Sequence, residues 1–100
     1  MWVKSWPRRR TVAIMGTTVV TVRYLAAARA AAGTHSENVD VGEGATVGDA
    51  LDVIAARHGE SLGKVLPACS FLLDSVAVRD RDTPLRAAAE LDVLPPFAGG

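Results

Sequence analysis

The sequence predicts a small α+β domain in which one main helix packs on a mixed sheet of about five strands. Residues 18–24 and 37–41 alternate apolar and polar side chains, as half-buried strands do. A well-capped amphipathic helix is predicted between Thr46 and Gly59. Several short strand patterns occupy the second half of the chain, and the last of them spans residues 90–94.

The first strand and the segment after it follow from alternation and from alanine content. Val20, Val22 and Tyr24 share one side of the strand, and we expect them in the core. Residues 25–32 are rich in alanine, and Gly33 follows them directly. Alanine is the strongest helix former and glycine commonly follows the last helical turn, so a short helix is expected here.

The next two elements are a second strand and the main helix. The strand presents Val39 and Val41 to the core, and Thr46 then caps the helix with Asp49 three residues later, close to a capping box. His58 lies in the last turn, where positive charge suits the helix dipole, and we interpret it as a surface residue. The apolar stripe of the helix consists of Val47, Ala50, Leu51, Ile54 and Ala55.

The second half is predicted to hold a connector, a hairpin, a charged loop, a turn and a final strand. The connector spans residues 60–68. The hairpin has strands at 70–73 and 76–78 with its turn at 74–75. The charged loop spans residues 79–84, the turn 85–89 and the final strand 90–94. This order of elements is that of a β-grasp (ubiquitin-like) fold, in which the first and last strands lie side by side at the centre of the sheet.

We expect three segments: a disordered extension over residues 1–16, the β-grasp domain over residues 17–94, and a flexible tail over residues 95–100. Residues 1–15 hold four basic residues and no acid, whereas residues 16–100 hold seven basic and eleven acidic residues. A signal peptide and a basic arm for nucleic acid or membrane are weaker alternatives for the extension, because its apolar run is short and it has only three consecutive arginines. The acidic domain argues against nucleic acid, no apolar run is long enough to span a membrane, and docking to basic protein surfaces is expected.

Cys69 is the only cysteine, so the chain can form neither an intramolecular disulfide nor a cysteine-rich metal site. A reducing cytoplasm is therefore the expected compartment. We interpret Cys69 as a packing residue, because no nearby histidine is predicted to lower its pKa. His35, in a polar turn, is likewise interpreted as non-catalytic, and we expect no bound metal or permanently bound cofactor.

The tail is the most informative stretch of the chain. Pro95 and Pro96 lack an N–H group and end the last strand, and six residues in extended conformation can reach about 20 Å from the domain. Gly99 and Gly100 carry no Cβ, so a partner backbone or a nucleotide can approach them closely. The terminal carboxylate is then a chemical handle at the end of a narrow probe.

Three stretches give the chain a resemblance to the sulfur-carrier family of molybdopterin synthase small subunits and thiamine-pathway carriers. They are residues 22–33 (VRYLAAARAAAG), residues 44–51 (GATVGDAL) and residues 94–100 (LPPFAGG), and the last is the most specific. Together they place the resemblance over about residues 17–100. The Pro-Pro pair favours the molybdopterin branch, whereas Phe97 stands where family members often have valine.

The resemblance implies a reaction at Gly100. An E1-like adenylyltransferase uses ATP to convert the Gly100 carboxylate to an acyl-adenylate, and a sulfurtransferase supplies the sulfur that displaces AMP and leaves a thiocarboxylate. The tail then enters the large synthase subunit and donates sulfur to the cyclic pyranopterin precursor. The chain is expected to be non-catalytic alone, because the family's catalytic pocket lies on the large subunit in a heterotetramer of two small and two large subunits.

The predicted site residues follow from this role. Gly100 reacts and Gly99 supplies clearance. The residues expected to contact the partner are Leu94, Pro95, Pro96, Phe97, Ala98, Leu25 and Phe71, with Leu72 as an alternative to Phe71. Three other functions stay open: a sulfur carrier for thiamine, cysteine or tRNA thiolation, a ubiquitin-like protein modifier, and a plain β-grasp interaction module.

Overall fold

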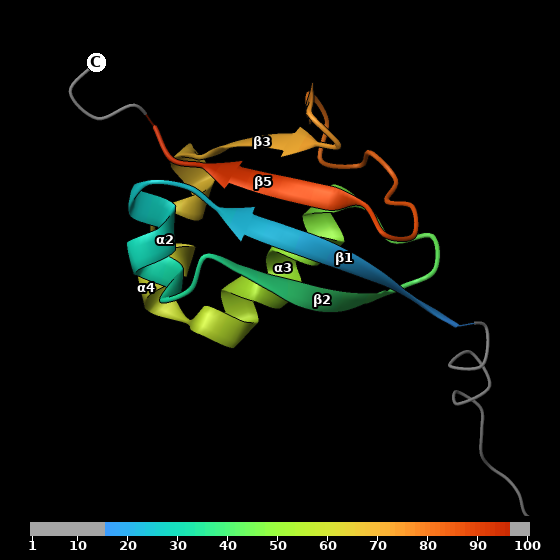
Figure 1. The fold of residues 1–100 in the computed structure, drawn as a ribbon, viewed down its shortest axis with the longest axis horizontal. Coiled ribbons are helices and arrows are strands. Elements are labelled where there is room, and N and C mark those ends of the chain that lie inside the picture. The colour runs from blue at the N-terminus through green and yellow to red at the C-terminus, as the bar shows by residue number, and fades with distance from the viewer. Residues whose placement is uncertain (1–15, 97–100) are drawn as a thin grey trace, which may run out of the picture.

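The computed structural model describes residues 16–96, which form one five-stranded sheet with helices on one face (Figure 1). The spatial order of the strands is β2-β1-β5-β3-β4. The strands are β1 (Thr17–Tyr24), β2 (Ser36–Gly42), β3 (Ser70–Leu73), β4 (Val76–Ala77) and β5 (Glu90–Leu94). The helices are α2 (Ala27–Ala32), α3 (Val47–His58) and α4 (Glu60–Gly63), followed by the 3-10 turn η1 (Leu66–Ala68). The predicted β-grasp architecture is therefore confirmed.

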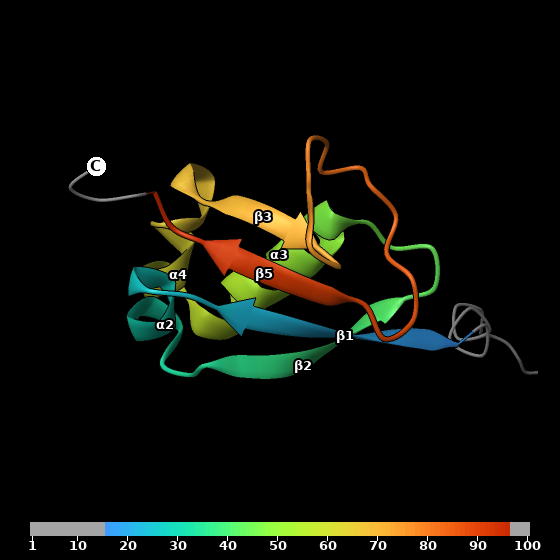
Figure 2. The same cartoon turned by 45° about the horizontal axis from the view of Figure 1, so that its top comes forward.

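Strand β5 lies at the centre of the sheet and connects the two halves of the chain (Figure 2). It pairs in parallel with β1, where Val22 lies opposite Leu91, and antiparallel with β3, where Phe71 lies opposite Val93. Strand β1 pairs antiparallel with β2 on its other side. The expected neighbourhood of the first and last strands is thus observed, and it fixes the strand from which the tail emerges.

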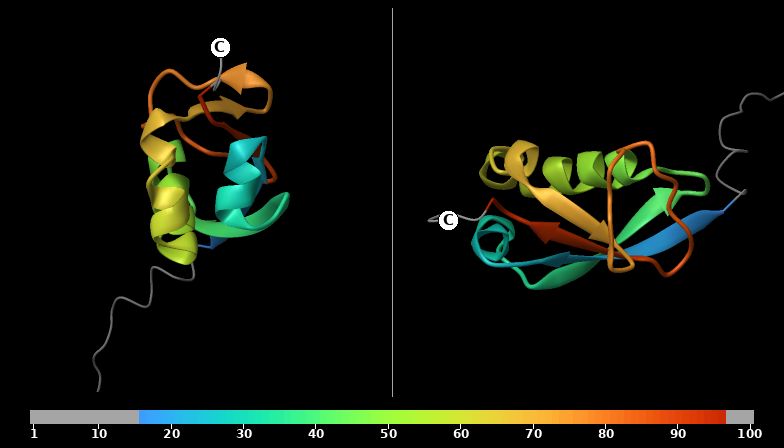
Figure 3. Two further views of the ribbon diagram at one scale, coloured as in Figure 1. Left: turned by 90° about the vertical axis from the view of Figure 1, so that its left-hand side faces the viewer. Right: turned by 90° about the horizontal axis from the view of Figure 1, so that it is seen from above.

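The core lies between the sheet and helix α3 (Figure 3). Alternation in β1 and β2 buries the residues that the sequence predicted, including Val20, Val22 and Tyr24 at 0–1% exposure. Helix α3 contributes Val47, Ala50, Leu51 and Ile54 from one side, while Ala55 is half-buried. The other fully buried large side chains are Val39, Leu62, Leu91 and Val93.

Helix α3 begins where the sequence places it, and two parts of the chain satisfy its first N–H groups. The Thr46 side chain accepts from the Asp49 amide and the Asp49 carboxylate accepts from the Thr46 amide, which completes the capping box. The carbonyls of Thr83 and Arg81 accept from the amides of Val47 and Gly48, at 2.9 and 2.8 Å. The charged loop therefore packs on the start of the helix, which the sequence did not indicate.

The hairpin between β3 and β4 turns at Asp74 and Ser75, as predicted. Both residues have positive φ, 49° and 72°, which is the backbone of a type I′ turn and suits the twist of the two strands. None of the helices within residues 16–96 is long and apolar enough to cross a membrane.

Candidate functional site

The candidate site is the base of the C-terminal tail, where β5 ends. Leu94 and Pro95 are half-buried, and Pro96 is exposed. Because neither proline carries an N–H group, the sheet hydrogen bonding stops here. The predicted residues Phe97, Ala98, Gly99 and Gly100 lie outside the described residues.

A two-point ion pair holds β5 against β1 two residues before the strand ends. The Arg23 guanidinium donates from Nε to Asp92 Oδ1 at 2.6 Å and from Nη2 to Asp92 Oδ2 at 2.9 Å. Asp92 is buried on the sheet face opposite the helices, and Glu90 lies 3.7 Å from the same guanidinium. Hydrogen bonding to Asp92 raises the pKa of Arg23, so this group stays charged. The pair fixes the register from which the tail leaves.

Leu25 lies beside the base of the tail and is 38% exposed, as the docking prediction requires. Its amide donates to the Val93 carbonyl at 3.1 Å, which extends the β1–β5 ladder by one bond. Ala26 then turns the chain into α2 with φ 51° and ψ −128°, a conformation that costs a residue with a Cβ about 1–3 kcal/mol. The turn closes with the Ala28 amide donating to the Leu25 carbonyl at 3.0 Å.

Phe71, which was predicted to contact a partner, is buried. It is 6% exposed and belongs to the core, since its register position opposite Val93 turns it toward helix α3. The Arg81 guanidinium lies over its ring, 5.2 Å from the ring centre. Leu72, which alternates with Phe71, is half-buried on the opposite face. Phe71 is therefore not part of an exposed apolar patch beside the tail, whereas Leu72 lies on the open face of the sheet; a partner contact by either residue stays a prediction.

A surface pocket adjoins Leu25 at the end of β1. Its lining consists of Arg23, Tyr24, Leu25, Arg29, His35 and Ser36. Arg29 is an exposed residue of α2, and its Nε lies 3.5 Å from the Tyr24 carbonyl. We call this group the corner pocket. It brings three nitrogen-bearing side chains next to one exposed leucine.

A polar cluster that the sequence did not predict lies between the sheet and the end of α3. It consists of Tyr24, Glu37, Arg57 and His58. The Glu37 carboxylate accepts from the Tyr24 hydroxyl at 2.6 Å and from Arg57 Nη1 at 2.8 Å, and it contacts His58 Nε2. Burial raises the pKa of Glu37, but the hydrogen bonds from Tyr24, His58 and Arg57 together hold it below its ordinary value. Burial and the Glu37 contact raise the pKa of Tyr24, so its hydroxyl remains a donor.

His58 is consequently more enclosed than a helix-end surface residue. Only 17% of its side chain is exposed, and its ring meets the Tyr24 ring edge-on at a centroid distance of 5.9 Å. Helix α3 ends so that His58 points back to β2, where Glu37 shares a face with Val39 and Val41. The alternation that predicted buried Val39 and Val41 extends to Glu37, so the sequence pattern could have placed Glu37 on the same inward face.

Cys69 has the environment of a packing residue. It is half-buried against the core, its thiol donates to the Val65 carbonyl at 3.2 Å, and burial raises its pKa. A nucleophilic cysteine needs the opposite shift. Within residues 16–96 no three histidine, cysteine, aspartate or glutamate side chains are grouped so as to hold a metal ion.

Comparison with known proteins gives one consistent result. The model of the ThiS family matches residues 22–100, which includes the C-terminal glycines. A molybdopterin synthase sulfur carrier subunit of Chlamydomonas reinhardtii is 34% identical over 82 residues, which cover 81% of this chain and 98% of that protein.

Two solved structures share the fold over nearly their whole length. SAMP1 of Haloferax volcanii is 29% identical with a TM-score of 0.73, and the match covers 82% of this chain and 99% of that one. A putative molybdopterin converting factor, subunit 1, of Pyrococcus furiosus is 26% identical with a TM-score of 0.73, and the match covers 80% and 99%.

Proposed function

The chain belongs to the ThiS family, and from this we propose that it is the sulfur-carrier subunit of a molybdopterin synthase, with Gly100 as the residue that carries sulfur. The observation that supports this most strongly is the 34% identity to a molybdopterin synthase sulfur carrier subunit along almost the entire length of that protein. Gly99 and Gly100 are the last two residues of the tail, which begins directly after the central strand.

Two steps on the Gly100 carboxylate make it a sulfur donor. A carboxylate is a poor electrophile, so its oxygen first attacks the α-phosphate of ATP on an activating enzyme, which releases pyrophosphate and forms the acyl-adenylate. The terminal sulfur of a cysteine persulfide on the sulfurtransferase then attacks the acyl carbon, and AMP leaves with the bonding electrons. A second thiol of the enzyme cleaves the S–S bond of the resulting acyl disulfide, so the enzyme is left with a disulfide and the sulfur stays on Gly100. The product is a thiocarboxylate, whose anionic sulfur is a good nucleophile toward the cyclic pyranopterin precursor.

The residues of this chain aim and support the tail in that reaction. Pro95 and Pro96 end the ladder and restrict the backbone, and Gly99 gives an enzyme close access to the reacting carbon. Phe97 and Ala98 are assigned to the walls of the entry channel. No general base is needed on this chain, since activation and transfer are assigned to its partners.

Those partners are a large synthase subunit that holds the precursor and the catalytic pocket, and an E1-like adenylyltransferase that uses ATP. The name of the Chlamydomonas relative describes a subunit, which supports an assembly with a second kind of chain. We assign the assembly two small and two large subunits and place it in the cytoplasm, where a lone Cys69 stays reduced.

Intact-mass spectrometry tests the proposal directly. The protein is incubated with the E1-like enzyme of the same organism, ATP and a sulfur donor, and the expected mass gain is that of one oxygen replaced by one sulfur at Gly100. A variant that lacks Gly99 and Gly100 is the matched control and should gain nothing. An unchanged mass would contradict the proposal, provided that the same enzyme preparation adenylates another carrier protein.

A protein modifier is the second candidate, because SAMP1 of Haloferax volcanii, a small archaeal modifier protein, has a similar fold at 29% identity. A modifier would be joined through Gly100 to lysine side chains of other proteins. Conjugates of higher mass in a lysate, lost when the two terminal glycines are deleted, would favour this function. A carrier for thiamine, cysteine or tRNA thiolation would give the same mass gain and differ only in the recipient.

A further inference from the structure

The corner pocket has a charge that its surroundings do not share. Three of its lining residues, Arg23, Arg29 and His35, are donors to anions, whereas residues 16–96 as a whole hold eleven acidic and seven basic residues. An acidic partner surface is therefore repelled by most of this molecule and attracted at this corner.

The nitrogen-bearing side chains of the pocket differ in how they are paired. Arg23 donates from Nε and Nη2 to Asp92, and the Glu90 carboxylate lies 3.7 Å from the same guanidinium. Arg29 makes one long contact, to the Tyr24 carbonyl at 3.5 Å. Within residues 16–96, neither Arg29 nor His35 has a carboxylate at ion-pair distance. The guanidinium of Arg29 is thus available to an incoming anion.

Leu25 links the pocket to the strand end from which the tail leaves. Leu25 lines it with 38% of its surface exposed, and the Leu25 amide bonds to the carbonyl of Val93, the residue before Leu94. Helix α2, which carries Arg29, lies at the end of the sheet where β5 finishes (Figure 1). A protein that binds the tail close to its base at Leu94 and Pro95 therefore lies next to Leu25 and the pocket.

We propose that the corner pocket receives an aspartate or glutamate side chain of the activating enzyme, with Arg29 as its main ion-pair partner and His35 and Leu25 at its sides. This inference rests on the proposed function, because it takes the enzyme that adenylates Gly100 as the partner. An acidic side chain in an apolar setting fits better than a free small anion, since Leu25 gives a small anion nothing to bind. Arg29 offers the planar, two-point recognition that carboxylates prefer.

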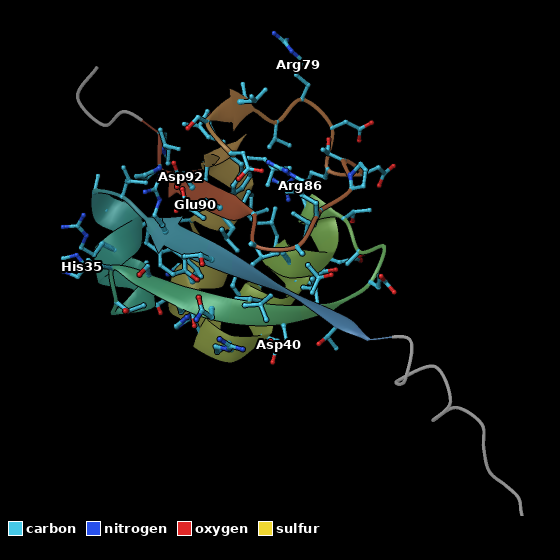
Figure 4. All side chains as sticks on the ribbon, turned by 45° about the vertical axis from the view of Figure 1, so that its right-hand side comes forward. His35, Asp40, Arg79, Arg86, Glu90 and Asp92 are labelled. Atoms are coloured by element: carbon cyan, nitrogen blue, oxygen red, sulfur yellow. The ribbon has the colours of Figure 1, made fainter. Side chains whose placement is uncertain are left out.

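Charge reversal with a distant control tests the proposal. The affinity of Arg29→Glu for the E1-like enzyme is measured by calorimetry at low and moderate salt, beside Arg79→Glu. Arg79 is an exposed arginine far from His35 (Figure 4) and also has no carboxylate at ion-pair distance within residues 16–96. We expect Arg29→Glu to bind about tenfold more weakly or worse, with a smaller salt dependence, and Arg79→Glu to bind like the wild type.

Arg29→Gln and an unfolding measurement on each variant separate lost charge from lost folding. Arg29→Gln should bind with intermediate affinity, and every variant should unfold at the wild-type denaturant midpoint. Wild-type affinity of Arg29→Glu, with normal thiocarboxylation of Gly100, would overturn this inference and leave the carrier function in place. Failure of the wild type to bind the enzyme and to become thiocarboxylated would overturn both.

A small-anion role of the pocket is distinguished by titrating inorganic phosphate alone. Millimolar phosphate that shifts the amide signals of Arg29 and His35, together with unchanged enzyme binding by Arg29→Glu, would assign the pocket to a free oxyanion and contradict the proposal.

Discussion

Arg23 and Asp92 lie opposite each other across the parallel β1–β5 pair, and the guanidinium grips both carboxylate oxygens at 2.6 and 2.9 Å. Arg23 is half-exposed, while the side chain of Asp92 is only 10% exposed. The pair therefore joins the strand that starts the domain to the strand that ends it. Asp92 lies two residues before Leu94, so loss of the pair should weaken the pairing of β5 with β1 next to the start of the tail.

Asp92→Asn is expected to lower the denaturant midpoint of unfolding more than Glu90→Gln does. Asparagine keeps the shape of aspartate but loses the charge and one acceptor oxygen, which leaves the two-point contact incomplete. Glu90 lies 3.7 Å from the guanidinium and is 52% exposed, so its contribution is screened by water. Equal midpoints for the two variants would show that the geometry of the Arg23–Asp92 contact contributes nothing beyond its charge.

Glu37→Gln should destabilise the protein by about 1–2 kcal/mol at pH 7, because a charged acceptor of three hydrogen bonds becomes neutral. The pKa of Glu37 is depressed in the folded state, so its contribution is complete above the unfolded value of about 4.3 and is lost as the pH falls further. The stability difference between wild type and variant should therefore be constant from pH 7 down to about pH 4.3 and shrink as the pH falls below that value.

The measurement for Glu37 is urea unfolding over that pH range, with the exposed Glu43→Gln as the control. Tyr24, Arg57 and His58 are the groups that contact the carboxylate, so Tyr24→Phe should remove part of the same effect. A difference between wild type and Glu37→Gln that does not depend on pH would contradict this account.

Ala26→Gly should stabilise the fold by about 1 kcal/mol, because glycine reaches φ 51° and ψ −128° without the strain of a Cβ. Ala30→Gly, at an exposed position inside α2, should destabilise it by about 1 kcal/mol. Opposite signs for two identical substitutions, measured by guanidinium unfolding, are the expected result. A destabilised Ala26→Gly would mean that the turn is not strained in solution.

Deletion of residues 97–100 should change the free energy of unfolding by less than about 1 kcal/mol while abolishing thiocarboxylation. The core and the described strands end at residue 94, so the domain does not depend on the tail for its packing. Two alanines added after Gly100 should abolish thiocarboxylation equally, because the reacting carboxylate is moved. A large loss of stability on deletion would show that the tail packs on the domain.

The fold was predictable because periodicity and capping agree along the whole chain. The alternation of Val20, Val22 and Tyr24 specifies one buried face, and Thr46 with Asp49 specifies where the main helix starts. The packing of Thr83 and Arg81 carbonyls on that helix was not predictable, since backbone groups leave no sequence pattern.

The site was predictable only in part. Leu25 is out of phase with β1, which correctly indicates exposure. In the run Phe71-Leu72-Leu73 every residue is apolar, so alternation cannot say which of them faces the core, and only the register with β5 decides. The contact of His58 with Glu37 joins residues 21 positions apart, which only the packing of α3 on β2 brings together.

The parallel pairing of β1 and β5 has a practical consequence for experiments on this protein. Parallel strands begin at the same edge, so residue 17 and residue 94 lie at opposite ends of the sheet, separated by about 25 Å along an eight-residue strand. A purification handle, a dye or a surface linker joined ahead of residue 16 is therefore attached far from the corner pocket and from Leu94. Immobilised by that end, the protein presents its reactive end to solution, whereas the same attachment at Gly100 would consume the group under study.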